Sequence, residues 1–155
     1  MITTLVLALA LAQSDEGLGV PAVEEPTTNQ WVVGARVELD AMGIIERQPA
    51  IAPAVFGSFG RGIWGAALTV IILPMFGVRA EGRVHLLEKS IVRPLFSLGV
   101  TVFGFAVAPH GSVGVTIDLG HVRLSLDAAV EYFFTGPYQF EPLAILSSVG
   151  VAWRF

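Results

Sequence analysis

The chain has 155 residues, of which 54% are hydrophobic and only 14% charged, and its mean hydropathy is +0.70. This composition is too apolar for an ordinary water-soluble domain and makes a membrane the first environment to consider. Cysteine is absent, which excludes disulfides and cysteine-ligated zinc, and the formal net charge of −4 comes without a basic run that would indicate nucleic-acid binding.

The N-terminal segment has the pattern of an export signal. Residues 1–12 (MITTLVLALALA) end in an Ala-Leu-Ala motif followed at once by polar residues, and the apolar run is too short to span a bilayer. We predict a secretory signal peptide cut after Ala12. A short anchor or a buried strand is the alternative, because no Lys or Arg precedes the apolar run. Residues 13–30 are mostly polar and acidic, which predicts a flexible periplasmic lead-in.

From residue 31 onward, apolar and polar positions alternate, with breaks at Pro, Gly and polar clusters, as in successive β-strands. The predicted strands are 31–41, 53–60, 63–72, 77–87, 95–107, 112–119, 121–134 and 143–155. Eight such strands make the smallest common membrane barrel. The predicted fold class is therefore all-β, an eight-stranded antiparallel up-and-down transmembrane β-barrel that occupies residues 31–155. Because proline cannot donate to a sheet ladder, we expect the prolines of this region between strands or, for Pro53, at a strand start.

The predicted connections alternate between the two sides of the membrane. With a periplasmic N-terminus, the outer loops are 42–52, 73–76, 108–111 and 135–142. The periplasmic turns are then 61–62, 88–94 and Gly120. Segments 53–60, 63–72 and 95–107 alternate poorly, and the uncharged run 63–78 leaves open a short helix of an inner-membrane protein. A soluble antiparallel sandwich would also alternate.

Four of the predicted strands have one apolar face and one charged face. The charged faces carry Arg36, Glu38, Asp40, Arg79, Glu81, Arg83, Asp118, Asp127, Arg123 and Glu131, and Arg154 of the last strand joins them. An eight-stranded barrel has an interior just wide enough for side chains, so these charges should pair, and the planar guanidinium suits bidentate pairing with carboxylates. We predict a lumen charge network that acts as a polar plug. A proton path or narrow pore, and a catalytic carboxylate pair, are the alternatives.

The last predicted strand alternates large apolar residues with small or charged ones and ends in an aromatic residue. It resembles the closing strand of bacterial outer-membrane β-barrels, in which the C-terminal Phe is part of the signal read by the barrel-insertion machinery. The resemblance implies that Phe155, Trp153 and Val151 form the insertion signal. It also implies an eight-stranded, OmpA-like or porin-like membrane domain in the bacterial outer membrane. The aromatic residues near strand ends form the predicted girdle: Trp31, Trp64, Tyr132 and Trp153.

The three histidines are the remaining candidates for chemistry. His85 and His121 fall on predicted lumen faces. His110-Gly111-Ser112 falls in a predicted outer loop and resembles the His-x-Ser of outer-membrane lipid A deacylases, in which His would activate Ser for acyl transfer. That pattern also needs an acid about one strand later, and Glu141 is the only rim acid available. No phosphate loop, dinucleotide fingerprint or metal-ligand spacing is present.

The sequence thus predicts a non-enzymatic integral outer-membrane barrel with a structural, adhesive or weakly permeating role, without catalytic residues, cofactor or metal. The alternatives are a narrow pore or transporter for a small hydrophobic molecule or ion, a lipid-modifying enzyme at the rim, and the inner-membrane helical protein. The expected partners are outer-membrane lipid and, during assembly, the barrel-insertion machinery and periplasmic chaperones. The barrel is expected to be a monomer.

Overall fold

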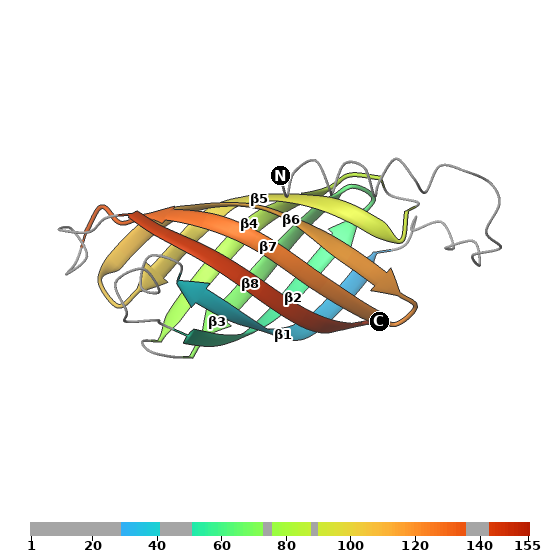
Figure 1. Cartoon of the computed structure of the whole chain (residues 1–155), viewed down its shortest axis with the longest axis horizontal. Helices are drawn as coiled ribbons and strands as arrows, with labels where there is room; N and C mark the ends of the chain where they lie inside the picture. The colour runs from blue at the N-terminus through green and yellow to red at the C-terminus, as the bar shows by residue number, and fades with distance from the viewer. Residues whose placement is uncertain (1–28, 41–50, 73–75, 88–89, 136–142) are drawn as a thin grey trace.

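The computed structural model describes residues 29–40, 51–72, 76–87, 90–135 and 143–155, which form one closed barrel of steeply inclined strands (Figure 1). The strands are β1 (Gln30–Asp40), β2 (Ile51–Arg61), β3 (Trp64–Ile71), β4 (Gly77–His85), β5 (Val92–Phe103), β6 (Ala106–Leu119), β7 (Val122–Tyr132) and β8 (Leu143–Arg154). Each pairs antiparallel with its neighbours in sequence, and β8 pairs with β1, which leaves no open edge. The predicted all-β, eight-stranded antiparallel barrel is confirmed.

The up-and-down order gathers the strand ends on two rims. The terminal rim holds Gln30, the turns at 62–63 and 120–121, and Arg154, whereas the far rim holds Asp40, the turn at 104–105 and Leu143. The predicted signal peptide and most of the lead-in, residues 1–28, lie outside the described residues. Gln30, the last residue of the predicted lead-in, already belongs to β1.

The strand boundaries depart most from prediction in β5 and β6. The predicted strand 95–107 crosses a tight turn, because β5 ends at Phe103 and β6 begins at Ala106. Gly104 in this turn has a φ of 54°, a conformation that glycine adopts without the penalty of a Cβ atom. The predicted outer loop 108–111 is wrong, since these residues are part of β6. The predicted periplasmic turn 88–94 is likewise too long, since residues 92–94 open β5.

Smaller departures occur at the other ends. Arg61, expected in a turn, closes β2, and Ile51 and Ala52, expected in an outer loop, open it. The predicted turn at Gly120 extends to residue 121, so β7 begins at Val122. The helical alternative for 63–78 is wrong, because residues 64–71 form β3 and residues 77–78 begin β4. Among the described residues, no helix has the length and apolar character to cross a membrane.

The expectation that prolines avoid strand interiors is wrong for Pro53, Pro94 and Pro109, and the stagger of the barrel explains why. Each strand pairs with two neighbouring strands, and each of these prolines is adjacent to the last residue that is paired with one of the two. The adjacent paired residues are Ala54, Leu95 and His110. The carbonyl of Pro53 still accepts the Ile72 N–H (2.9 Å), and that of Pro94 accepts the Leu86 N–H (2.8 Å). Because strands in a sheared barrel end at different heights on their two sides, the missing proline N–H falls where the ladder has already stopped.

The barrel has an apolar outside and a polar inside. The outward positions carry exposed large hydrophobic residues, such as Leu98 (77% exposed) and Val149 (61%), whereas the lumen holds most of the buried charged residues. The lumen faces of β2 and β3 are lined mainly by small residues, which explains their poor alternation: Ala54, Ser58, Gly60, Gly65 and Ala67. Arg36 from β1 and Arg83 from β4 extend over this part of the lumen wall, where both lie over the Phe56 ring.

Candidate functional site

The candidate site is the charged lumen, which contains two separate clusters. We define the middle cluster as Arg36, Glu38, Arg79, Glu81, Arg83, Ser97, Thr101, His110, Ser112 and Glu131. We define the terminal cluster as Arg93, Asp118, Arg123 and Arg154. The predicted network residues fall into these two groups except Asp40 and Asp127, which are partly exposed on β1 and β7. The sequence predicted a single set of lumen charges, and that set left out Arg93 and also His110, which was predicted in an outer loop.

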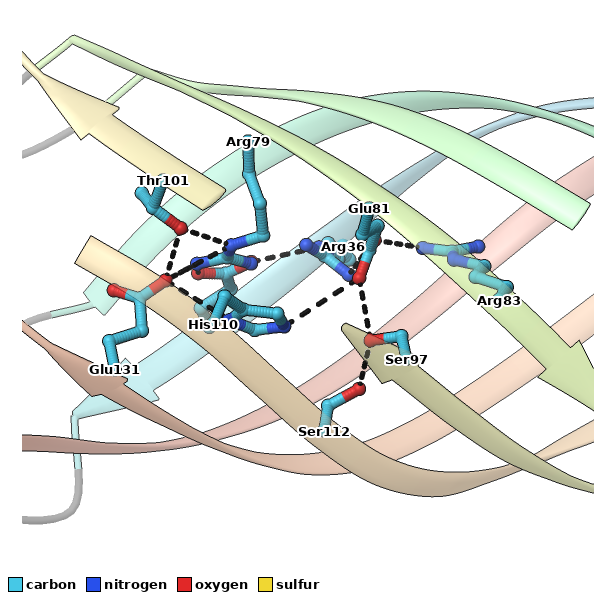
Figure 2. Close-up of polar contacts among 10 residues, drawn as sticks. Arg36, Arg79, Glu81, Arg83, Ser97, Thr101, His110, Ser112 and Glu131 are labelled. Carbon is cyan, nitrogen blue, oxygen red and sulfur yellow. Dashed lines mark hydrogen bonds and ion pairs between the residues drawn. The ribbon is translucent and has the colours of Figure 1, made fainter. Parts of the chain in front are cut away.

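Arg79 is the centre of the middle cluster (Figure 2). The residue is 1% exposed, and it forms a bidentate pair with Glu38 from β1, with Nη1–Oε1 at 2.6 Å and Nη2–Oε2 at 3.0 Å. Its Nη2 also donates to Glu131 from β7 (2.8 Å), and its Nε donates to the Thr101 hydroxyl from β5 (2.8 Å). One guanidinium group from β4 therefore links three other strands across the lumen.

Glu131 is the acceptor on the opposite side of this arrangement. Its Oε1 receives hydrogen bonds from Arg79 and from the Thr101 hydroxyl, and it lies 3.1 Å from His110 Nδ1. The other ring nitrogen, His110 Nε2, lies 3.6 Å from Glu81 Oε2. In Figure 2 the imidazole ring lies between these two carboxylates. The prediction of His110 in an outer loop is wrong, because Pro109 was taken as a strand breaker although β6 continues through it.

Glu81 joins the remaining part of the middle cluster. It pairs with Arg83 (2.5 Å) and more distantly with Arg36 (3.7 Å), and its other oxygen accepts the Ser97 hydroxyl (2.9 Å). Arg36 also pairs with Glu38 (2.8 Å). The guanidinium groups of Arg36 and Arg83 both lie over the Phe56 ring, at 5.9 and 5.4 Å from its centroid, which is within range of a cation–π interaction.

The charges of the middle cluster are balanced. Three arginines meet three glutamates, all of them buried, so that each charge removed from water has an opposite charge close by. Buried ions are tolerated when they are paired and hydrogen-bonded in this way. The arrangement joins β1, β4, β5, β6 and β7 across the interior.

The terminal cluster converges on one carboxylate. Asp118 forms a bidentate pair with Arg123, at 2.5 and 2.9 Å, and lies 3.2 Å from Arg93 and 3.8 Å from Arg154. Arg93 also donates to the Ser90 carbonyl (3.1 Å). Sequence reasoning missed Arg93 because Pro94 was taken as the end of a turn. Arg93 and Ser97 share one strand face while Phe96 and Leu98 occupy the other, and this period-two spacing was the signal that could have placed Arg93 on a strand.

The other two histidines differ in their positions. His85 ends β4 and is partly buried at the terminal rim, on the lumen side. His121 is exposed and stacks on the Trp153 ring, with 5.5 Å between the centroids. The predicted lumen position of His121 is therefore wrong, because residue 121 belongs to a turn, where the period-two alternation of a strand no longer applies.

The predicted girdle residues are distributed over both rims of the barrel. Trp31, Trp64 and Trp153 are exposed on the terminal rim, at 59%, 67% and 51%, whereas Tyr132 lies on the far rim beside Phe134. The residues of the predicted insertion signal, Val151, Trp153 and Phe155, are all exposed. The Phe155 N–H donates to the Trp31 carbonyl (2.9 Å), which extends the contact between β8 and β1.

The geometry offers little support for catalysis by the His110–Ser112 pair. Both residues lie within β6, and the ring nitrogens of His110 face Glu131 and Glu81. The Ser112 hydroxyl instead contacts the Ser97 hydroxyl (2.6 Å). Glu141, the acid that the deacylase pattern would need, lies outside the described residues. Within the described part of the chain, no group of His, Asp or Glu side chains has the arrangement of a metal site.

The barrel is similar to those of several solved structures, among them OprF and NspA. The N-terminal β-barrel domain of Pseudomonas aeruginosa OprF superposes with a TM-score of 0.57 at 13% identity, covering 81% of this chain and 97% of that one. Neisserial surface protein A (NspA) superposes with a TM-score of 0.54 at 14% identity, covering 82% of this chain and 97% of that one. No protein-family model and no curated protein matches the sequence. At such low identity the likeness shows a common fold, and the expected similarity to small outer-membrane barrels is confirmed at that level.

Proposed function

We propose that this protein is an integral β-barrel of the bacterial outer membrane with a structural role and a lumen closed to solutes. The observation that carries the proposal is the reversal of polarity between the two surfaces, with large apolar residues exposed outside and ion pairs buried inside. Exposed hydrophobic surface of this extent is costly in water and favourable in lipid. The fold shared with OprF and NspA supports the same location.

The aromatic residues support a defined position in the bilayer. Tryptophan and tyrosine prefer the interface between hydrocarbon and headgroups, because their rings combine an apolar body with a polar group. Three tryptophans at the terminal rim, and Phe105, Tyr132 and Phe134 at the far rim, are all exposed. They would bracket an apolar belt, so outer-membrane lipid is the proposed partner. The barrel-insertion machinery is the proposed partner during assembly, through β8.

The middle cluster supports the proposal of a closed lumen. A solute that crossed the barrel would have to separate Arg79 from Glu38 and Glu131, which leaves buried charges unpaired. A permeation role is therefore the less favoured function. A non-enzymatic role is favoured because the carboxylates of the middle cluster already bond arginine, threonine or histidine groups. A carboxylate that acts as a general acid or base would instead need contact with a substrate.

Outer-membrane fractionation combined with gel migration tests the proposed location. The protein should fractionate with the outer membrane, and unboiled samples in SDS should migrate differently from boiled ones, because a closed barrel resists SDS until it is heated. Circular dichroism of the unboiled sample should show β-structure. Identical migration together with a helical spectrum would contradict the proposal.

A further inference from the structure

A small cavity at the terminal rim has a lining of unusual charge. It has a volume of about 20 Å³ and is bordered by residues of β1, β2, β3, β4, β5 and β7. Three arginines and a histidine line it, namely Arg83, Arg93, Arg123 and His85, together with the neutral polar side chains of Gln30 and Ser58. No Asp or Glu belongs to this lining in the described part of the chain, so its titratable side chains are all basic.

Two residues of this lining have a buried polar atom that is unsatisfied. Arg83 Nε and His85 Nε2 are buried and have no hydrogen-bond partner among the described residues. Arg83 as a whole is only 8% exposed, and its salt bridge with Glu81 uses a different nitrogen, Nη2. Buried polar groups in native proteins are almost always hydrogen-bonded, and those without a protein partner often mark a bound water or ion. The three lining arginines have two carboxylate partners just outside the lining, Glu81 and Asp118. The remaining excess of positive charge beside an unsatisfied guanidinium N–H favours an anion over a water molecule.

We propose that this cavity binds a small phosphate-type oxyanion that enters from the terminal rim. Guanidinium groups match the geometry of phosphate oxygens, and a partly buried site strengthens the attraction. The volume is enough for one or two oxygen-sized groups, so the cavity takes one edge of the anion, and its remaining oxygens stay at the rim. The site shares Arg83 with the middle cluster, and Arg83 Nη2 remains paired with Glu81 while its Nε is free to donate to the anion.

The test uses Ser58, which lines the cavity. Ser58→Asp places a carboxylate among the arginines. Ser58→Asn is the control, because asparagine has the size of aspartate without its charge. Both are prepared in a Trp31→Phe/Trp153→Phe background, so that Trp64, which also lines the cavity, is the only tryptophan left. Inorganic phosphate is titrated into the folded barrel in a zwitterionic detergent, with ionic strength held constant by sodium gluconate.

The Trp64 emission of the parent and of the Ser58→Asn variant should change saturably with phosphate. Ser58→Asp should bind phosphate at least about tenfold more weakly, because its carboxylate repels the anion and occupies its place. Without phosphate, the Ser58→Asp barrel should need a higher temperature than the Ser58→Asn barrel to lose its SDS-resistant form, and phosphate should reduce this difference.

The absence of a saturable change in the parent would overturn the proposal, as would equal responses in all three proteins. A parallel titration with micelles that contain phosphatidylglycerol separates the two sources of phosphate. If only the lipid alters the Trp64 emission, the site for a free oxyanion is refuted. Loss of the SDS-resistant form in either Ser58 variant without phosphate would also count against it, since the cavity is expected to accept an added carboxylate.

Discussion

Replacing Arg79 with methionine should lower the free energy of unfolding by about 3–5 kcal/mol, the range measured when one partner of a buried ion pair is removed. Arg79 is 1% exposed, and its guanidinium group bonds Glu38, Glu131 and Thr101. Methionine keeps most of the side-chain volume, so little of the lost stability would come from packing. The loss would come from the buried carboxylates of Glu38 and Glu131, which would no longer be paired with Arg79. Urea unfolding of the barrel in detergent micelles, followed by tryptophan fluorescence, measures the difference.

Arg154→Met is the matched control for this substitution. Arg154 also lies in the lumen, but its side chain is 22% exposed and its contact with Asp118 is long, at 3.8 Å. Because solvent screens such a pair, the change should cost less than about 1 kcal/mol. Equal and small effects of the two substitutions would show that the middle cluster contributes little to stability.

The second large effect is expected at Gly99, where β5 passes close to β4. A Cβ atom on Gly99 would lie 2.8 Å from the Cα and the Cβ of Glu81 and would also collide with the Ala80 carbonyl oxygen. Gly99→Val should therefore destabilise the barrel by about 3 kcal/mol, because overpacking forces backbone shifts. Glu81 belongs to the middle cluster, so the shift would also disturb its contacts with Arg83 and Ser97.

Gly57→Val provides the comparison. Gly57 is also a strand glycine, but a Cβ atom there would meet nothing within 4 Å, and its position on β2 faces outward. Valine suits a strand and a lipid-facing surface, so folded yield and unfolding midpoint should be unchanged or higher. If Gly57→Val is as damaging as Gly99→Val, strand glycines matter for a reason other than the narrow interior. SDS-resistant yield after refolding measures both variants.

The fold could be predicted because its two main signals are local. The alternation along β1, β4 and β7 places charges on one face and apolar residues on the other, and this pattern does not depend on the rest of the chain. The same signal is weak in β2 and β3, because small residues occupy the lumen face there. These small residues leave space for Arg36 and Arg83 of the flanking strands β1 and β4, and the closed barrel that brings these side chains together is not visible in the sequence of β2 and β3 alone.

The errors over Arg93 and His110 come from treating proline as an end of structure. Pro94 and Pro109 were taken as breaks, so Arg93 and His110 were assigned to a turn and to an outer loop. Both prolines are instead accommodated by the stagger of the barrel, which is a property of the closed sheet. The division of charges into two clusters depends on the same stagger, because the register decides that Arg79 meets Glu38 while Arg123 meets Asp118.

The central claim is that this chain forms a membrane barrel whose lumen is closed by buried ion pairs. Planar-bilayer recording tests this claim most directly. The account predicts that the purified, SDS-resistant protein adds no stepwise current above the bare bilayer, whereas Arg79→Met, if it inserts, opens intermittently. Regular stepwise openings of the wild-type protein that Arg79→Met leaves unchanged would contradict the account.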